Sequence, residues 1–201
     1  MTKTVSKFIS VIFHPLIMPA AGLFIILNSN TYLTDMPYEM KKGLYMIIIA
    51  GTLVFPLLVL PLYFLFNIIE NVEMSSRKER IIPLLTTAVV YFLVYRLLYN
   101  AGVPDIIYRF LLGSFIAVCI ALAVSFFWKI SLHMVGAGGV IGLVLGLSLI
   151  FSANFLIVFV LCIFCAGILG TARLLLNAHD SYQVGAGAIV GIAAVLGAMV
   201  V

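Results

Sequence analysis

Long apolar runs alternate with short polar connections along the whole chain. The runs are roughly Phe8–Leu27, Gly43–Ile69, Pro83–Tyr99, Ile106–Trp128, Met134–Phe151, Phe155–Leu176 and Asp180–Val201. About 20 mostly apolar residues suffice for a helix to cross a bilayer. The runs are continuous and do not show the two-residue alternation of membrane β-strands. The pattern therefore predicts an all-α polytopic transmembrane helix bundle of about six to seven spans, with residues 1–201 forming a single integral membrane domain.

Proline and glycine predict where these helices bend and where they pack closely. His14 and Pro15 interrupt the first run, which we expect to remain as an uncleaved helix with His14 in a helix-breaking or packing role. Pro56 and Pro61 predict a kink in the second run. The fifth and seventh runs are rich in glycine, at Gly136, Gly138, Gly139, Gly142 and Gly146, then at Gly185, Gly187, Gly191 and Gly197. Close helix packing is the main interpretation of these glycines, and a phosphate cradle is the alternative.

Composition supports a membrane protein and narrows its partners. Hydrophobic residues make up 65 % of the chain and charged residues 9 %, and the mean hydropathy is +1.29. A soluble domain could not bury so much apolar surface. Because no soluble part carries a basic face, we expect membrane lipids as partners and no nucleic acid. The three cysteines lie inside apolar runs, which favours core thiols over a disulfide framework, a metal site or a redox role.

The number of spans predicts which polar residues share a membrane face. With seven spans, the connections after the second, fourth and sixth spans lie on the side of the N-terminus. They contain the stretches Ser75–Pro83, Trp128–His133 and Ala172–Asp180. Seven of the eleven Lys and Arg residues then lie on this side, namely Lys3, Lys7, Arg77, Lys78, Arg80, Lys129 and Arg173. Polar groups that converge at one membrane edge indicate a functional site.

The residue types in these connections suit phosphoryl transfer. Guanidinium groups match phosphate oxygens with paired hydrogen bonds. Of two histidines, His133 and His179, one could attack phosphorus while the other protonates the leaving alkoxide. No carboxylate cluster suited to magnesium accompanies them, so we expect chemistry without a metal or another cofactor. We also expect Asn177 to cap the last helix, with His179 in its first turn and Gln183 orienting the histidine ring.

The same residues match three sequence motifs in order. Arg173, five residues, His179, three residues and Gln183 are similar to Ser-Arg-x5-His-x3-Asp. The stretch "ISLH" at residues 130–133 is similar to Pro-Ser-Gly-His, and "RKERIIP" at residues 77–83 is similar to Lys-x6-Arg-Pro. These are the third, second and first motifs of the type 2 phosphatidic acid phosphatase family, which the chain therefore resembles from about Arg77 to Gly191.

The resemblance implies a metal-independent membrane lipid phosphatase that works through a phosphohistidine. In that family the residue corresponding to His179 is the nucleophile, and the one corresponding to His133 protonates the leaving group. Phosphate would be held by Arg173, by one of Arg77, Lys78 and Arg80, and by Ser131. The family acts on lipid phosphates and diphosphates. It further implies a bacterial inner-membrane protein with its site on the outer, periplasmic face, whereas the charge count alone leaves the orientation open.

Departures from the motifs motivate two other hypotheses. Gln183 replaces the family's aspartate, so it can orient an imidazole but cannot stabilise an imidazolium by charge. Glu73 stands seven residues before Arg80, where the first motif has lysine, and Ile81 replaces the proline after the arginine. One hypothesis is a catalytically degenerate family member that binds or translocates a phospholipid or polyprenyl phosphate. The other is a structural bundle without a site. The lipid headgroup and the oligomeric state stay open.

Overall fold

The computed structural model describes residues 1–72, 74 and 76–201, so Glu73 and Ser75 lie outside the described residues. Within this part of the chain, seven helical spans are long and apolar enough to cross a membrane, and there is no strand. The predicted all-α transmembrane bundle is confirmed. The helices are α1 (Lys3–Ile12), α2 (Met18–Leu27), α3 (Tyr38–Ile49), α4 (Phe55–Leu65), α5 (Ile81–Asn100), α6 (Asp105–Ser125), α7 (Leu132–Phe151), α8 (Leu156–Leu175) and α9 (Ser181–Val200).

The first two spans are each built from two helices. In the first span, α1 ends at Ile12, and the short 3₁₀ helix η1 (Pro15–Ile17) leads into α2. In the second span, the π-helical turn η3 (Ala50–Val54) joins α3 to α4 directly before Pro56. Both irregularities fall where proline removes a backbone donor from the helical ladder. Two further 3₁₀ helices, η2 (Tyr32–Asp35) and η4 (Lys78–Arg80), lie in the connections before α3 and α5.

Helix α7 lies at the centre of the bundle and packs against α9. A Cβ atom added at Gly142 would lie 2.6 Å from the carbonyl oxygen of Ile192, and one added at Gly187 would lie 2.6 Å from that of Ser131. Only hydrogen fits at these positions, so the two backbones approach each other closely. Helix packing is thus the role of Gly142 and Gly187, as the main sequence interpretation predicted, whereas Gly185 and Gly197 face open space. This packing fixes the start of α9 beside the start of α7.

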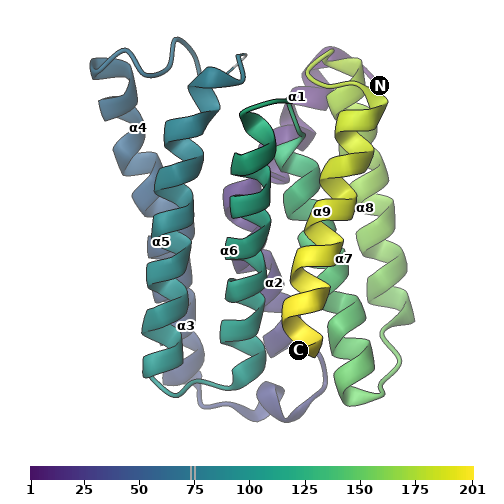
Figure 1. The fold of residues 1–201 in the computed structure, drawn as a ribbon. Helices are drawn as coiled ribbons and strands as arrows, with labels where there is room; N and C mark the ends of the chain where they lie inside the picture. Colours follow the sequence, from purple (N-terminus) through teal and green to yellow (C-terminus); the bar gives the residue numbers. More distant parts are fainter. Residues whose placement is uncertain (73, 75) are drawn as a thin grey trace.

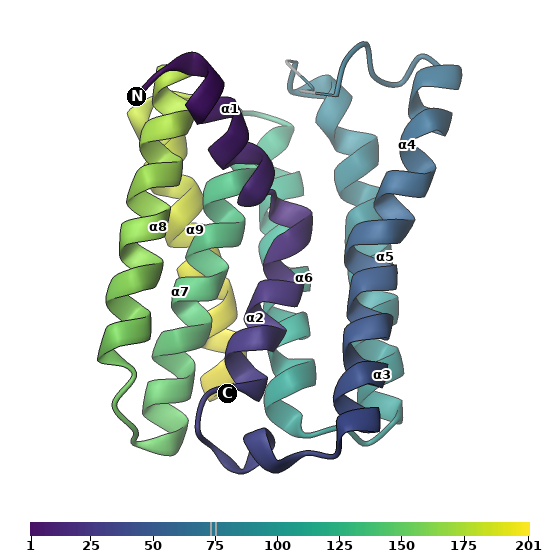
Figure 2. The same cartoon turned by 180° about the vertical axis from the view of Figure 1, so that it is seen from behind.

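The two ends of the bundle carry different connections (Figures 1 and 2). The N-terminus lies at the end where the α4–α5, α6–α7 and α8–α9 connections also lie, and the C-terminus lies at the opposite end. The predicted parity of the spans is therefore confirmed. Helices α3, α4 and α5 form one side of the bundle, and the top of α4 lies at its outer edge (Figure 1).

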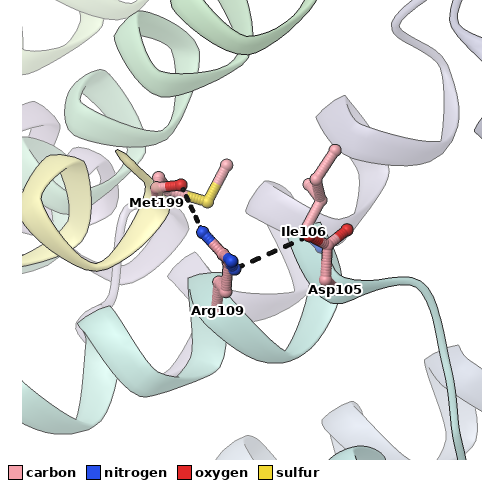
Figure 3. Close-up of polar contacts among 4 residues, drawn as sticks. All are labelled: Asp105, Ile106, Arg109 and Met199. Carbon is pink, nitrogen blue, oxygen red and sulfur yellow. Dashed lines mark hydrogen bonds and ion pairs between the residues drawn. The ribbon is translucent and has the colours of Figure 1, made fainter. Parts of the chain in front are cut away.

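Arg109 ties two helices together at the end that holds the C-terminus. Its Nη1 donates a hydrogen bond of 3.3 Å to the carbonyl oxygen of Met199, and its Nε lies 3.6 Å from Oδ2 of Asp105 (Figure 3). A cation beside the last carbonyls of a helix complements the negative end of the helix dipole. Arg109 therefore pins the end of α9 to the start of α6, far from the connections that hold the predicted site.

Candidate active site

One cavity of about 220 Å³ gathers charged and titratable side chains at the N-terminal end of the bundle. Its arginine and histidine side chains, which we call the polar wall, are His14, Arg80, His133, Arg173 and His179. The cavity continues between the helices into an apolar region, where its walls include Leu60 of α4, Tyr91 of α5, Phe110 of α6 and Val195 of α9. The arrangement suits an amphiphilic ligand, because anionic groups can meet the cations while an apolar chain fills the deeper part.

The connection between α8 and α9 positions His179. Asn177 follows α8 in the left-handed conformation, with φ of 51°, and turns the chain back toward the cavity. Asp180 is the N-cap of α9, and its side chain accepts a hydrogen bond of 2.8 Å from the backbone N–H of Gln183. The expectation that Asn177 caps this helix is therefore wrong, and His179 lies just before α9 rather than in its first turn. Both residues are good caps, but only Asp180 has the extended backbone that an N-cap needs.

Gln183 orients the His179 ring, as its spacing predicted. The Nδ1 atom of His179 lies 2.8 Å from the amide oxygen of Gln183. Because an amide oxygen can only accept, Nδ1 carries the proton in this contact. The lone pair of the neutral ring is then on Nε2, which is the nitrogen available for attack on an electrophile. The geometry thus leaves the lone pair on one specific nitrogen.

The surroundings of His179 keep its ring neutral. Burial, as the largest cause, and the positive charges of Arg80, Arg173 and Lys129 together lower the pKa of His179 from 6.5 to about 4. The hydrogen bond with Gln183 acts in the opposite direction. A proton on His179 is disfavoured because the imidazolium would be both desolvated and surrounded by cations. The His179 ring is therefore unprotonated at neutral pH.

We expect His179 to titrate near pH 4 in the folded protein. The chain has three histidines, so single replacements can assign every ring-nitrogen signal of tag-free protein labelled with [¹⁵N]histidine. The depressed pKa means that the ring remains neutral as the pH falls through 6.5 and takes up its proton only near pH 4. The pH dependence of the His179 signals measures the midpoint. A midpoint between 6 and 7 would show that the ring is neither desolvated nor close to the cations.

Arg80 is the member of the Arg77–Arg80 cluster that faces the cavity. It is 5 % exposed, and it donates from Nε to the carbonyl oxygen of Met74 and from Nη1 to that of Ile130, both at 3.0 Å. Arg77 is exposed and donates to the carbonyl oxygen of Phe127 at 2.7 Å. Lys78 is also exposed, and neither residue lines the cavity. The sequence left the choice among the three open, and burial and position favour Arg80.

Ser10 of helix α1 contacts two of the site residues, His133 and Arg173, and sequence reasoning missed this role. The backbone carbonyl oxygen of Ser10 lies 3.1 Å from Nε2 of His133, and the Ser10 hydroxyl accepts a hydrogen bond of 3.1 Å from Nη1 of Arg173. A carbonyl oxygen only accepts, so His133 carries its proton on Nε2. Its other nitrogen, Nδ1, takes no part in this contact. The buried serines Ser6 and Ser10, four residues apart on one helix face, were the available sequence signal.

Ser131 connects the site helices without lining the cavity. Its backbone N–H donates to the carbonyl oxygen of Gln183 at 3.3 Å, which joins the start of α7 to the start of α9. Its hydroxyl is buried and has no hydrogen-bond partner among the described residues. The structure therefore places Ser131 beside the predicted phosphate ligands as a link between helices. Among the described residues, no three His, Cys, Asp or Glu side chains are grouped so that they could hold a metal ion.

Comparisons with known proteins add no relative to this picture. No family model, no curated protein and no solved structure matches the chain. Support for a function therefore comes from the cavity itself. Four residues predicted from three connections line that one cavity, namely His179, His133, Arg173 and Arg80, and Gln183 contacts His179.

Proposed function

We propose that the protein hydrolyses a lipid-linked phosphate or diphosphate without a metal ion, through a phosphohistidine intermediate. The observation that carries this proposal is the cavity shared by two histidines and two arginines, in which the free lone pair of His179 is on Nε2. We place the protein in a bacterial inner membrane with this site on the periplasmic face. That placement follows from the resemblance to the type 2 phosphatidic acid phosphatases.

The first chemical step would transfer the phosphoryl group to His179. Its Nε2 attacks phosphorus and forms the P–N bond while the P–O bond to the lipid breaks. With the anionic substrate beside it, His133 takes up a second proton on Nδ1. It donates this proton to the departing oxygen and becomes neutral. Arg80 and Arg173 hold the remaining phosphate oxygens, where the charge of the transition state is concentrated. The phosphoryl group thus moves from the lipid oxygen to Nε2 of His179 without an additional reactant.

The second step would return the enzyme to its starting state. A water molecule gives one proton to neutral His133 and attacks phosphorus with its oxygen. The P–N bond breaks, inorganic phosphate leaves, and His179 recovers the lone pair on Nε2. His133 is protonated again for the next cycle. Both histidines therefore serve in both half-reactions, as acid–base catalysts and covalent catalysts commonly do.

The apolar continuation of the cavity supports a lipid substrate. Leu60, Tyr91 and Phe110 line this part of the cavity. Helix α4, which contributes Leu60, lies at the outer edge of the bundle (Figure 1). A lipid phosphate presents a charged group at the membrane edge and an apolar chain within the bilayer. Its two parts match the two parts of the cavity.

The direct test is phosphate release by purified protein in detergent with a chelator present. The panel contains phosphatidic acid, phosphatidylglycerol phosphate and a polyprenyl diphosphate. We expect release from at least one of these lipids. Absence of release across the panel, together with retained binding of lipid phosphate, would contradict the hydrolase and support a protein that binds or translocates such lipids.

Gln183 favours this second, non-catalytic function, and its replacement separates the two. Attack by Nε2 places positive charge on the His179 ring, and a carboxylate at Nδ1 would stabilise that charge. We expect Gln183→Asp to raise turnover about 10- to 100-fold, which corresponds to roughly 1.4–2.8 kcal/mol of transition-state stabilisation. Gln183→Ala, which removes the orienting contact, should lower it. Release by Gln183→Asp from a silent parent would establish the degenerate binder, and a drop in turnover would contradict the proposed role of the ring charge.

A further inference from the structure

His14 lies at the cavity, although its position before Pro15 predicts only a helix break. Helix α1 ends at Ile12, and His14 precedes η1 as its N-cap. The Nδ1 atom of His14 accepts a hydrogen bond of 3.3 Å from the backbone N–H of Leu16. Because Nδ1 accepts, the proton of the neutral ring is on Nε2. The ring therefore has an N–H donor beyond the one atom that its capping role uses.

The bend that carries His14 is pressed against α7 beside His133. The two imidazole rings meet edge to face, with centroids 5.5 Å apart and planes at 80°. One turn farther along α7, a Cβ atom added at Gly136 would lie 2.8 Å from Cγ of Met18 and 3.4 Å from Cα of Pro15. Glycine at position 136 thus permits the close approach. The close approach at Gly136 therefore brings His14 beside His133.

The neighbours of His14 belong to the polar wall of the cavity. His133 is held by the carbonyl oxygen of Ser10, and Arg173 is held by the hydroxyl of the same residue, one turn before His14 in the sequence. His14 lines the cavity together with both. An N–H donor that shares a cavity with a guanidinium and a second imidazole is suited to the oxygen of an anion.

We propose that His14 contacts the phosphate group of the bound ligand, donating a hydrogen bond from Nε2 to a phosphate oxygen on the side of His133. The inference rests on the anion site of the proposed function, and it does not require turnover. It adds a ligand-binding residue from the first span, outside the region of residues 77–191 that carries the motifs. A purely structural His14 would need only Nδ1 to cap η1.

Two replacements separate binding from capping. His14→Asn keeps an acceptor for the Leu16 N–H, since asparagine is a preferred N-cap, but it removes the Nε2 donor. His14→Phe keeps an aromatic ring against His133 and removes both nitrogens. Lys7→Ala is the matched control, because it removes an exposed cation from the same span that does not line the cavity. Thermal unfolding of each variant in detergent establishes that it is folded.

The probes are inorganic phosphate and a short-chain phosphatidic acid, titrated into tag-free protein labelled with [¹⁵N]histidine. We expect the His14 Nε2 signal of the parent protein to shift on addition of phosphate. We expect both His14 variants to bind each probe about 10-fold more weakly, the loss of one charge-assisted hydrogen bond, and Lys7→Ala to bind within about 2-fold of the parent.

Each outcome decides the inference. Parent-like binding by His14→Asn, or a His14 signal that phosphate does not move, would overturn it and leave His14 as a cap. Should the parent bind neither probe, the anion site and the inference would fall together. Binding without phosphate release would remove the hydrolase only, and the comparison of the His14 variants would still stand. The shift in the parent protein keeps the test valid if a variant does not fold.

Discussion

Replacing His179 with alanine is expected to lower phosphate release by at least about 10³-fold, because the variant loses the atom that forms the covalent intermediate. Binding of lipid phosphate should weaken much less, since Arg80 and Arg173 remain in the cavity. Initial rates of release from the most active lipid, set beside binding of the same lipid, measure the two effects separately.

The intermediate itself gives a second measurement of the same prediction. Rapid quenching of the parent protein with a ³²P-labelled lipid should trap label on the protein in a form that is stable to alkali and lost in acid, as a P–N bond requires. His179→Ala should carry no such label. The matched control is Tyr182→Ala, which removes an exposed side chain from the first turn of α9 and should retain release and label. Full release by His179→Ala would exclude His179 as the nucleophile.

Replacing Arg80 with methionine is expected to lower kcat/KM for lipid phosphate by about 10²-fold or more, the effect of removing a donor that stabilises transition-state charge. The guanidinium is buried at the cavity and is fixed by two backbone carbonyls, so its position costs little to maintain during the reaction. Arg80→Lys keeps the charge but loses the planar fork, and an intermediate loss is expected. Steady-state kinetics with one lipid across the three proteins provides the series.

Arg77 provides the matched control for Arg80. It lies three residues earlier, has the same side chain and also donates to a backbone carbonyl, but it is exposed and does not line the cavity. Arg77→Met should therefore change kcat/KM by less than about 3-fold, within the range of surface substitutions. Equal losses in Arg77→Met and Arg80→Met would mean that the cluster acts through its overall charge, and Arg80 would lose its assigned role.

The sequence predicts the number and the limits of the helical spans well, because both follow from the thickness of the bilayer. The hydrophobic thickness of a bilayer fixes how many apolar residues a span needs, so the polar connections mark the ends of the helices. Parity then assigns each connection to a side. The contact between His179 and Gln183 was also predictable, because the two residues are four positions apart where a helix begins.

Other parts of the site could not be read from the sequence, for physical reasons. Asn177 and Asp180 both suit a helix cap, and the backbone conformation that chooses between them depends on how α8 ends. The roles of Ser10 and His14 depend on contacts with α7 and α8, which lie more than 100 residues away along the chain. Arg80 is distinguished from Arg77 only by burial, which arises from the packing of the whole bundle.

Two side chains of the site, His133 and Arg80, are held by backbone carbonyl oxygens. His133 contacts the carbonyl of Ser10, and Arg80 contacts those of Met74 and Ile130. Every amino acid carries such a carbonyl, so evolution can exchange the side chains at these supporting positions while the support stays in place. Alanine scanning would report Met74 and Ile130 as silent, whereas at Ser10 it would also remove the hydroxyl that accepts from Arg173. Inserting one residue into α1 would rotate the Ser10 carbonyl by about 100° and expose the dependence. The architecture can thus persist in sequences that share few of its letters.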